Sequence, residues 1–147
     1  DILRSFEKNE SVVIRNPKAT RPWQHVLEPL SGYLVLVQKM YSGKGKYAEG
    51  WNFGPNKQDV KPVGWILDEM IEKWPNSSWK LDSDSNPHEA GFLQLDIAKA
   101  ESKLGWKPVW GLSQTLEKIV DWHKDWLSKK DMQSVCLTEI KEYMRDM

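Results

Sequence analysis

The chain has 147 residues, of which 39% are hydrophobic and 29% charged, a composition typical of one folded domain and unlike that of a disordered tail. Basic and acidic side chains number 21 each, so no net charge attracts nucleic acid or an acidic membrane, and any anion site must be local. Cys136 is the only cysteine, which excludes an intrachain disulfide. We expect a cytoplasmic protein with neither a membrane span nor a nucleic-acid partner.

The first half of the chain predicts short strands between amphipathic helices. The opening is typical of the end of a helix and does not begin with Met, so we expect a piece of a longer protein. A β-branched run then predicts a buried strand, and a loop with two prolines precedes a helical apolar pattern. The expected elements are a helix end at 1–8, a strand at Val12–Ile14, a polar loop at 16–25, a helix at Val26–Tyr41 and a strand at Trp51–Pro55 that leaves its sheet.

The second half predicts further helices and one edge strand. Asp96 is expected to cap one helix, Gly105 to end it in a left-handed conformation, and Ser113 to begin the next. The expected elements are a helix at Val63–Trp74, an edge strand at Trp79–Leu81, a linker at Asp82–Pro87 and helices at 97–104, 113–127 and 138–145. The fold class is therefore α/β, a mixed α+β arrangement within a single region, 1–147.

Arg21 is the first candidate for binding chemistry, because it lies in the loop between a predicted strand and a predicted helix. A guanidinium group donates two parallel hydrogen bonds to phosphate and loses less hydration than an ammonium group, so a diphosphate suits it. Composition alone favours the plainer interpretation, a surface arginine paired with an acid.

Two other residues, Glu89 and His25, have two open interpretations each. Glu89, beside His88, could accept hydrogen bonds from vicinal sugar hydroxyls, or it is a solvated loop acid. His25 could donate to a substrate, or it has a capping or core role. His123 lies on an apolar helix face and is most simply a satisfied, partly buried histidine. The scattered histidines and the lone cysteine show no metal-ligand spacing, so we expect no metal site.

Taken together, these segments resemble a known family. The strings Arg21-Pro22-Trp23-Gln24-His25, Glu49-Gly50-Trp51-Asn52-Phe53-Gly54-Pro55, Pro87-His88-Glu89-Ala90 and Leu104-Gly105-Trp106-Lys107-Pro108 stand in the order found in the CDP-glucose 4,6-dehydratases of the extended short-chain dehydrogenase/reductase superfamily. The resemblance covers essentially the whole chain. It implies the C-terminal, nucleotide-sugar-binding part of a Rossmann-type enzyme.

The resemblance also implies what this chain lacks and what it retains. The family binds NAD through a glycine fingerprint and uses a Tyr-x-x-x-Lys pair, and neither pattern occurs here, so we expect no cofactor in this chain, no catalytic residue and no activity from it alone. Arg21 would hold the substrate pyrophosphate, and Glu89 would lie near the ribose. Many relatives carry a second arginine just before the acidic position, where this chain has Asn86-Pro87-His88. The implied substrate-binding set is Arg15, Arg21, Gln24, His25, His88 and Glu89.

In the intact family, CDP-glucose is converted to CDP-4-keto-6-deoxyglucose, in the biosynthesis of deoxysugars such as those of O-antigen. We expect CDP-glucose as ligand and a homo-oligomer, because the predicted strand at Trp51–Gly54 would leave an unpaired sheet edge. The alternatives are a stand-alone or truncated binding or interaction domain without catalysis, and part of a related nucleotide-sugar dehydratase or epimerase.

Overall fold

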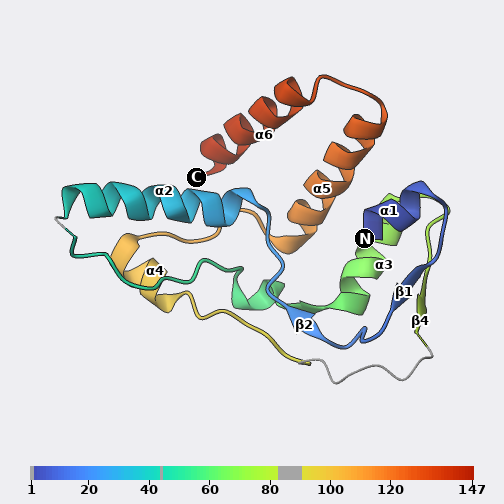
Figure 1. Ribbon diagram of the computed structural model, residues 1–147, viewed down its shortest axis with the longest axis horizontal. Helices are drawn as coiled ribbons and strands as arrows, with labels where there is room; N and C mark the ends of the chain where they lie inside the picture. Colours follow the sequence, from blue (N-terminus) through green and yellow to red (C-terminus); the bar gives the residue numbers. More distant parts are fainter. Residues whose placement is uncertain (1, 44, 83–90) are drawn as a thin grey trace.

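The computed structural model describes residues 2–43, 45–82 and 91–147 and has the expected mixed α/β architecture (Figure 1). Its elements, in chain order, are α1 (Ile2–Glu7), β1 (Val12–Ile14), β2 (Thr20–Arg21), α2 (Leu27–Ser42), the 3-10 turn η1 (Lys57–Asp59), β3 (Lys61–Pro62), α3 (Val63–Lys73), β4 (Trp79–Leu81), α4 (Ala98–Leu104), α5 (Leu112–Leu127) and α6 (Met132–Asp146). Figure 1 shows α1, α3, β1 and β4 gathered at one end, α2 and α4 extending to the other, and the α5–α6 hairpin joining the two ends.

Both sheets among the described residues are two-stranded. β1 pairs in parallel with β4, with Val12 opposite Trp79, so the predicted edge strand at 79–81 is confirmed. β2 pairs with β3 in the antiparallel sense. Side chains along a strand alternate between its two faces, and only the face of Val12 packs on the core, so the neighbouring Val13 is 53% exposed. The strand predicted as buried is buried on one side only.

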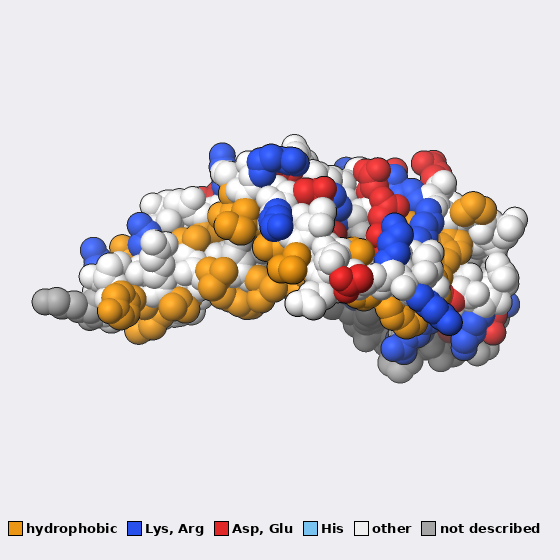
Figure 2. All heavy atoms as spheres, turned by 90° about the horizontal axis from the view of Figure 1, so that it is seen from above, with side chains coloured by type: hydrophobic (Ala, Val, Ile, Leu, Met, Phe, Trp, Pro, Cys, Tyr) orange, Lys and Arg blue, Asp and Glu red, His pale blue; other side chains and the backbone are white. Residues whose placement is uncertain are grey.

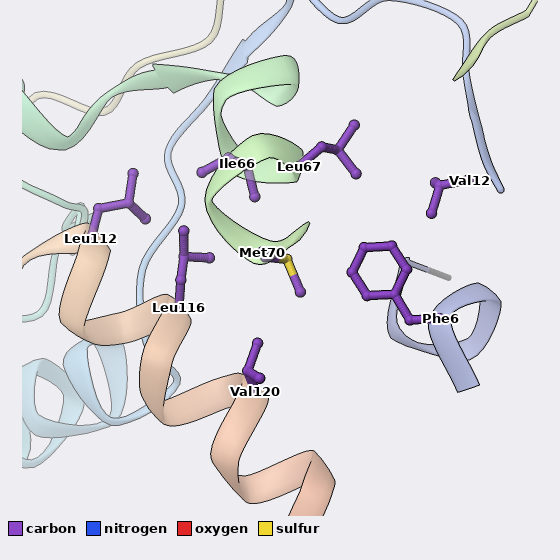
Figure 3. Packing of buried hydrophobic residues seen from close by; sticks show 8 residues of the cluster. All are labelled: Phe6, Val12, Ile66, Leu67, Met70, Leu112, Leu116 and Val120. Carbon is purple, nitrogen blue, oxygen red and sulfur yellow. The ribbon is translucent and has the colours of Figure 1, made fainter. Parts of the chain in front are cut away.

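The main apolar core forms where α3 and α5 pack against α1 and β1. The helical spacing of the apolar residues in α3 and α5 turns one face of each helix inward, as the sequence predicts. Figure 3 shows the side chains of this core converging from the four elements. Its members are Phe6, Val12, Ile66, Leu67, Met70, Leu112, Leu116 and Val120.

The prediction of a strand at Trp51–Pro55 is wrong, because these residues join no β-ladder. Side chains satisfy this backbone instead: Gln24 Nε2 donates to the carbonyl of Phe53 at 2.9 Å. The Phe53 ring packs edge-on against Trp106 and against Gly32 of α2, where an added Cβ would lie 2.3 Å from the ring. Phe53 therefore anchors a second, smaller core, and the expected sheet edge does not exist here.

Helix boundaries follow local capping chemistry. Gly105 ends α4 with φ at 74°, as predicted. Asp96 Oδ1 accepts from Ala98 N, the first residue of α4, at 2.9 Å, but the N-cap position is Ile97, one residue after the predicted one. α5 begins at Leu112, one residue before the predicted Ser113, where Asp59 Oδ1 accepts from Leu112 N at 3.3 Å. This cap comes from a distant turn, so the local sequence could not indicate it.

The last helix is much longer than the prediction of 138–145. α6 begins at Met132, because Asp131 accepts hydrogen bonds from Gln133 N and from the hydroxyl of Ser134. The cap was readable in the sequence, but the apolar spacing that follows it is weak. α6 then folds back on α5 and brings the C-terminus beside α2 (Figure 1).

α2 has its apolar face outward. Its buried residues are Glu28, Ser31 and Gly32, whereas Leu34 is 72% and Val37 62% exposed. We call this exposed set the α2 outer face: Val26, Leu30, Tyr33, Leu34, Val37 and Tyr41. Figure 2 shows a row of apolar side chains along this end of the molecule, while acidic and basic side chains crowd the other end.

Candidate functional site

The predicted anion loop begins at Arg21, the last residue of β2. Its backbone lies opposite Lys61 in the β2–β3 pair, and its Nη1 donates to the carbonyl of Thr20 at 2.8 Å. A tight turn follows, closed by Trp23 N donating to the carbonyl of Arg21 at 2.9 Å. The Trp23 ring packs against the main core, so the backbone on both sides of Arg21 is fixed by the fold.

A cleft of about 590 Å³ opens beside this loop. β1 and the side chains of Ile66, Met70 and Leu116 supply its apolar walls. Arg15 and Arg21 both line it, and Asn16 lies between them along the chain. The structure thus brings together two of the six predicted binding residues, on the side of the core where β1 ends.

The electrostatics around the cleft are locally positive although the chain is neutral overall. Arg15 and Arg21 line the cleft, and Lys61 faces Arg21 in the neighbouring strand, where its ammonium lies 5.7 Å from the centre of the Trp65 ring. Two guanidinium groups on a partly apolar cleft suit a ligand that carries both a ring and a phosphate group. A nucleoside diphosphate has this chemistry.

Gln24 and His25 turn away from the cleft. Gln24 bonds to Phe53, as described above, and its Oε1 is buried with no partner among the described residues. His25 is 4% exposed, and its Nδ1 accepts from Leu27 N at 3.3 Å. Its ring lies edge-on to Trp110. The structure thus places His25 in the capping and core position that the sequence left open.

Burial sets the protonation state of His25. Desolvation, aided by the positive charge of Lys118, lowers the pKa of this imidazole to about 4. Glu139 faces it, with 3.8 Å between His25 Nε2 and the carboxyl oxygen, and burial raises the pKa of Glu139. His25 is therefore neutral near pH 7. His123, predicted to be satisfied, contacts Glu7 and the Trp74 ring.

His88 and Glu89 lie outside the described residues, so their predicted roles stay predictions. Gly91, the first described residue after this segment, accepts from Thr20 N through its carbonyl at 2.9 Å and so lies beside β2.

Glu28 is a buried charged residue that the sequence reasoning missed. Glu28 is 0% exposed, and its carboxyl group accepts from Val109 N, Trp110 N and the hydroxyl of Tyr143, at 3.0, 2.7 and 2.7 Å. One signal was available, because Glu28 falls on the same helical face as Ser31 and opposite the apolar stripe of α2. An apolar stripe ordinarily faces inward, so the opposite face, which carries Glu28, was expected to be exposed.

Other site chemistry finds little support in the described residues. No three His, Cys, Asp or Glu side chains among them are grouped to hold a metal ion. A larger hollow of about 930 Å³ lies between Pro55–Gln58 and α4, but it contains none of the predicted binding residues. In the described part of the chain, no helix combines the length and apolar character needed to cross a membrane.

NAD does not fit the described residues. Dinucleotide sites place a glycine turn between a parallel strand and the helix that follows it. Here β1 runs into Asn16 and Pro17, and β4 is followed by Asp82 and the segment outside the description.

Comparison with known proteins gives a strong match and several distant ones. The chain is 54% identical over 145 residues, 98% of its length, to a CDP-glucose 4,6-dehydratase of Salmonella typhimurium. It is 25% identical over 120 residues to UDP-glucuronic acid decarboxylase 2 of Arabidopsis thaliana, and 24% identical over 115 residues to a UDP-glucose 4-epimerase of Pisum sativum, covering 81% and 76% of this chain. No family model matches the chain.

These matches cover only part of each relative. The chain spans 40% of the length of the dehydratase, 25% of the decarboxylase and 31% of the epimerase. The resemblance found in the sequence is therefore confirmed: 98% of this chain aligns with a C-terminal portion of a longer CDP-glucose 4,6-dehydratase.

Proposed function

We propose that this chain, related over 98% of its length to a CDP-glucose 4,6-dehydratase, is the nucleotide-sugar-binding C-terminal portion of such an enzyme. One observation carries the proposal: Arg15 and Arg21 line the same partly apolar cleft. In this role Arg21 binds the diphosphate, β1 and the apolar wall take the nucleoside, and Arg15 contributes positive charge at the rim.

The chain orients substrate but does not perform the redox chemistry alone. The conversion of CDP-glucose to CDP-4-keto-6-deoxyglucose requires NAD to accept and return a hydride, and the described residues do not fit that cofactor. The single cysteine, Cys136, is half-buried and accepts a hydrogen bond from Trp122 Nε1, which suits a protein of the reducing cytoplasm.

The α2 outer face supports the view that this portion works as part of a larger enzyme. Six exposed apolar side chains on α2 and its N-cap residue, Val26, exceed what a free surface usually carries. In the longer enzyme this face packs against a portion that has no counterpart in the chain. In the isolated chain it drives self-association, a role that the sequence had given to residues 51–54.

Calorimetric titration with CDP-glucose tests the binding role. We expect the 147-residue chain to bind, Arg21→Ala to weaken binding by about tenfold to a hundredfold, and Arg15→Ala to weaken it less. Arg145→Ala is the matched control, because Arg145 is exposed on α6, away from the cleft. Cytidine, which lacks phosphate, should bind equally to all variants that keep the cleft wall. Absence of wild-type binding at millimolar ligand would remove the proposal.

Two alternatives have distinct outcomes in the same titration. A related dehydratase or epimerase for another nucleotide, as among the UDP-sugar relatives, would prefer UDP-glucose. A stand-alone interaction domain would bind neither sugar nucleotide.

Sedimentation velocity across a wide range of concentrations tests self-association. We expect dimers or larger species that Leu34→Glu returns to monomer, since Leu34 is 72% exposed. Gln38→Glu, on the same helix but outside the apolar stripe, is the control. A wild-type chain that stays monomeric would contradict the role of the α2 outer face.

A further inference from the structure

A buried polar cluster connects α2, the segment before α5, and α6. We call Glu28, Ser31, Trp106, Trp110 and Tyr143 the polar clamp. Glu28 receives the three hydrogen bonds given above, and Trp106 Nε1 donates to Ser31 Oγ at 2.9 Å. The hydroxyls of Ser31 and Tyr143 lie 3.0 Å apart. All five side chains are buried, so a polar atom that lost its hydrogen-bond partner could not bond to water instead.

Tyr143 is the member of the clamp contributed by α6. Its ring lies edge-on to Trp110 with 5.0 Å between centroids, and its hydroxyl donates to Glu28. Burial, together with the hydrogen bond to Glu28, raises the pKa of Tyr143, so the hydroxyl keeps its proton as a donor. Tyr143, near the C-terminus, is thus hydrogen-bonded to the first turn of α2.

The first turn of α2 is in turn joined to the anion loop. Glu28 N donates to the carbonyl of His25 at 3.1 Å, and Leu27 N donates to the imidazole of the same residue. The His25 ring lies 5.0 Å from the Trp110 ring, centre to centre. Residues 25–28 are therefore joined by hydrogen bonds and pack against the polar clamp. Gln24, which is bonded to Phe53, connects them along the chain to Trp23 and Arg21.

We propose that Tyr143, acting through Glu28, is a positioning residue for Arg21, so that α6 sets how firmly the anion loop is held beside the cleft. The inference rests on the proposed role of Arg21 as the diphosphate ligand. It does not place Tyr143 near any substrate. A fixed loop binds a diphosphate more tightly because less freedom is lost when the ligand arrives.

Amide hydrogen exchange tests the connection without any ligand. Tyr143→Phe keeps the ring packing and removes the hydroxyl that donates to Glu28. We expect exchange at the amides of Trp23, Leu27 and Glu28 to accelerate about tenfold, at a temperature where circular dichroism shows both proteins folded. Tyr41→Phe is the control, because Tyr41 is 94% exposed. Acceleration confined to α6 and to residues 109–110 would overturn the proposal.

Ser31→Ala is a milder second variant for the case in which Tyr143→Phe fails to fold. It removes the hydroxyl that contacts Tyr143 and Trp106, and it should accelerate the same loop amides by a smaller factor. Unchanged exchange at Trp23 in this variant, with faster exchange at the Trp106 indole, would also overturn the proposal.

Binding gives an independent readout. We expect Tyr143→Phe to weaken CDP-glucose binding about fivefold, to leave cytidine binding unchanged, and to have no further effect once Arg21→Ala is present. Equal weakening toward cytidine, or additive effects of the two substitutions, would show a general structural role and overturn the proposal. If the wild-type chain binds no nucleotide, the proposed function fails, while exchange at Trp23 still decides the positioning role.

Discussion

The two ends of this molecule are stabilised in opposite ways. At one end, α3 and α5 bury aliphatic side chains, and the packing needs no polar partner (Figure 3). At the other, α2 buries Glu28 and Ser31 and exposes Leu34 and Val37. The first is the ordinary arrangement of an independent core. The second shows a helix whose apolar side belongs to an interface and whose inner side is fixed by directional hydrogen bonds.

The largest expected effect compares one leucine from each end. Leu67→Ala, at a 0% exposed position, should lower the free energy of unfolding by about 3 kcal/mol through a cavity in the main core. Leu34→Ala, at 72% exposure, should change it by less than about 0.5 kcal/mol. Urea denaturation at low protein concentration measures both. A comparable loss at Leu34 would mean that the α2 outer face is already covered in the isolated chain.

The next prediction concerns the pH dependence that His25 adds at the polar end. The pKa of His25 is about 4 in the folded chain and 6.5 when exposed, so between these values the unfolded chain binds a proton that the folded chain does not. The free energy of unfolding should therefore fall by about 2 kcal/mol as the pH drops from 6.5 to 4. Above pH 6.5 this contribution is fully present.

The groups facing His25 change how steeply the free energy of unfolding depends on pH. Lys118 makes the dependence steeper, because its charge helps to lower the pKa of His25. Glu139 has a raised pKa and takes up a proton in the folded chain, which makes the dependence weaker at the acid end of the range. His25→Asn keeps an acceptor for Leu27 N and removes the titrating group, so its stability should depend less on pH. Equal slopes in urea titrations of the two proteins would contradict the assignment.

The smallest effect is expected from an exception within the apolar end. Thr115 of α5 is 1% exposed, and its hydroxyl has no partner among the described residues. Thr115→Val keeps the branched shape and removes the unpaired hydroxyl, so it should raise the free energy of unfolding by about 1 kcal/mol. Thr138→Val, at an exposed threonine that bonds to the carbonyl of Ser134, should be nearly neutral by thermal denaturation. Destabilisation at Thr115 would indicate a bonded hydroxyl.

Local patterns predicted the helices and the strands β1 and β4, but neither β2, which lies in the predicted loop at 16–25, nor β3. The apolar spacing of α3 and α5, the hydrogen bond from Ala98 N to Asp96 and the left-handed Gly105 all depend on neighbours within a few residues. The strand at 51–55 was wrong because Phe53 finds its partners in Gln24, Gly32 and Trp106, which lie far away along the chain. A run of apolar residues indicates burial, but it does not tell what kind of neighbour buries it.

The candidate site divides in the same way. The sequence singled out Arg21 and, by family resemblance, Arg15, and the structure places both at one cleft. It turns Gln24 toward Phe53, and it places His25 against Leu27 and Trp110. Glu28 was missed, since a buried carboxyl group is recognised by its donors, and these come from residues 109, 110 and 143.

By itself the sequence determined the fold class, most helix positions, the local positive charge at Arg21 and the relationship to the nucleotide-sugar enzymes. These follow from periodicity, capping and ordered motifs, which are properties of short segments. Only the tertiary structure decided which face of α2 turns inward, because that depends on partners more than 70 residues away along the chain. The same distant contacts bury His25 and hold the loop that carries Arg21.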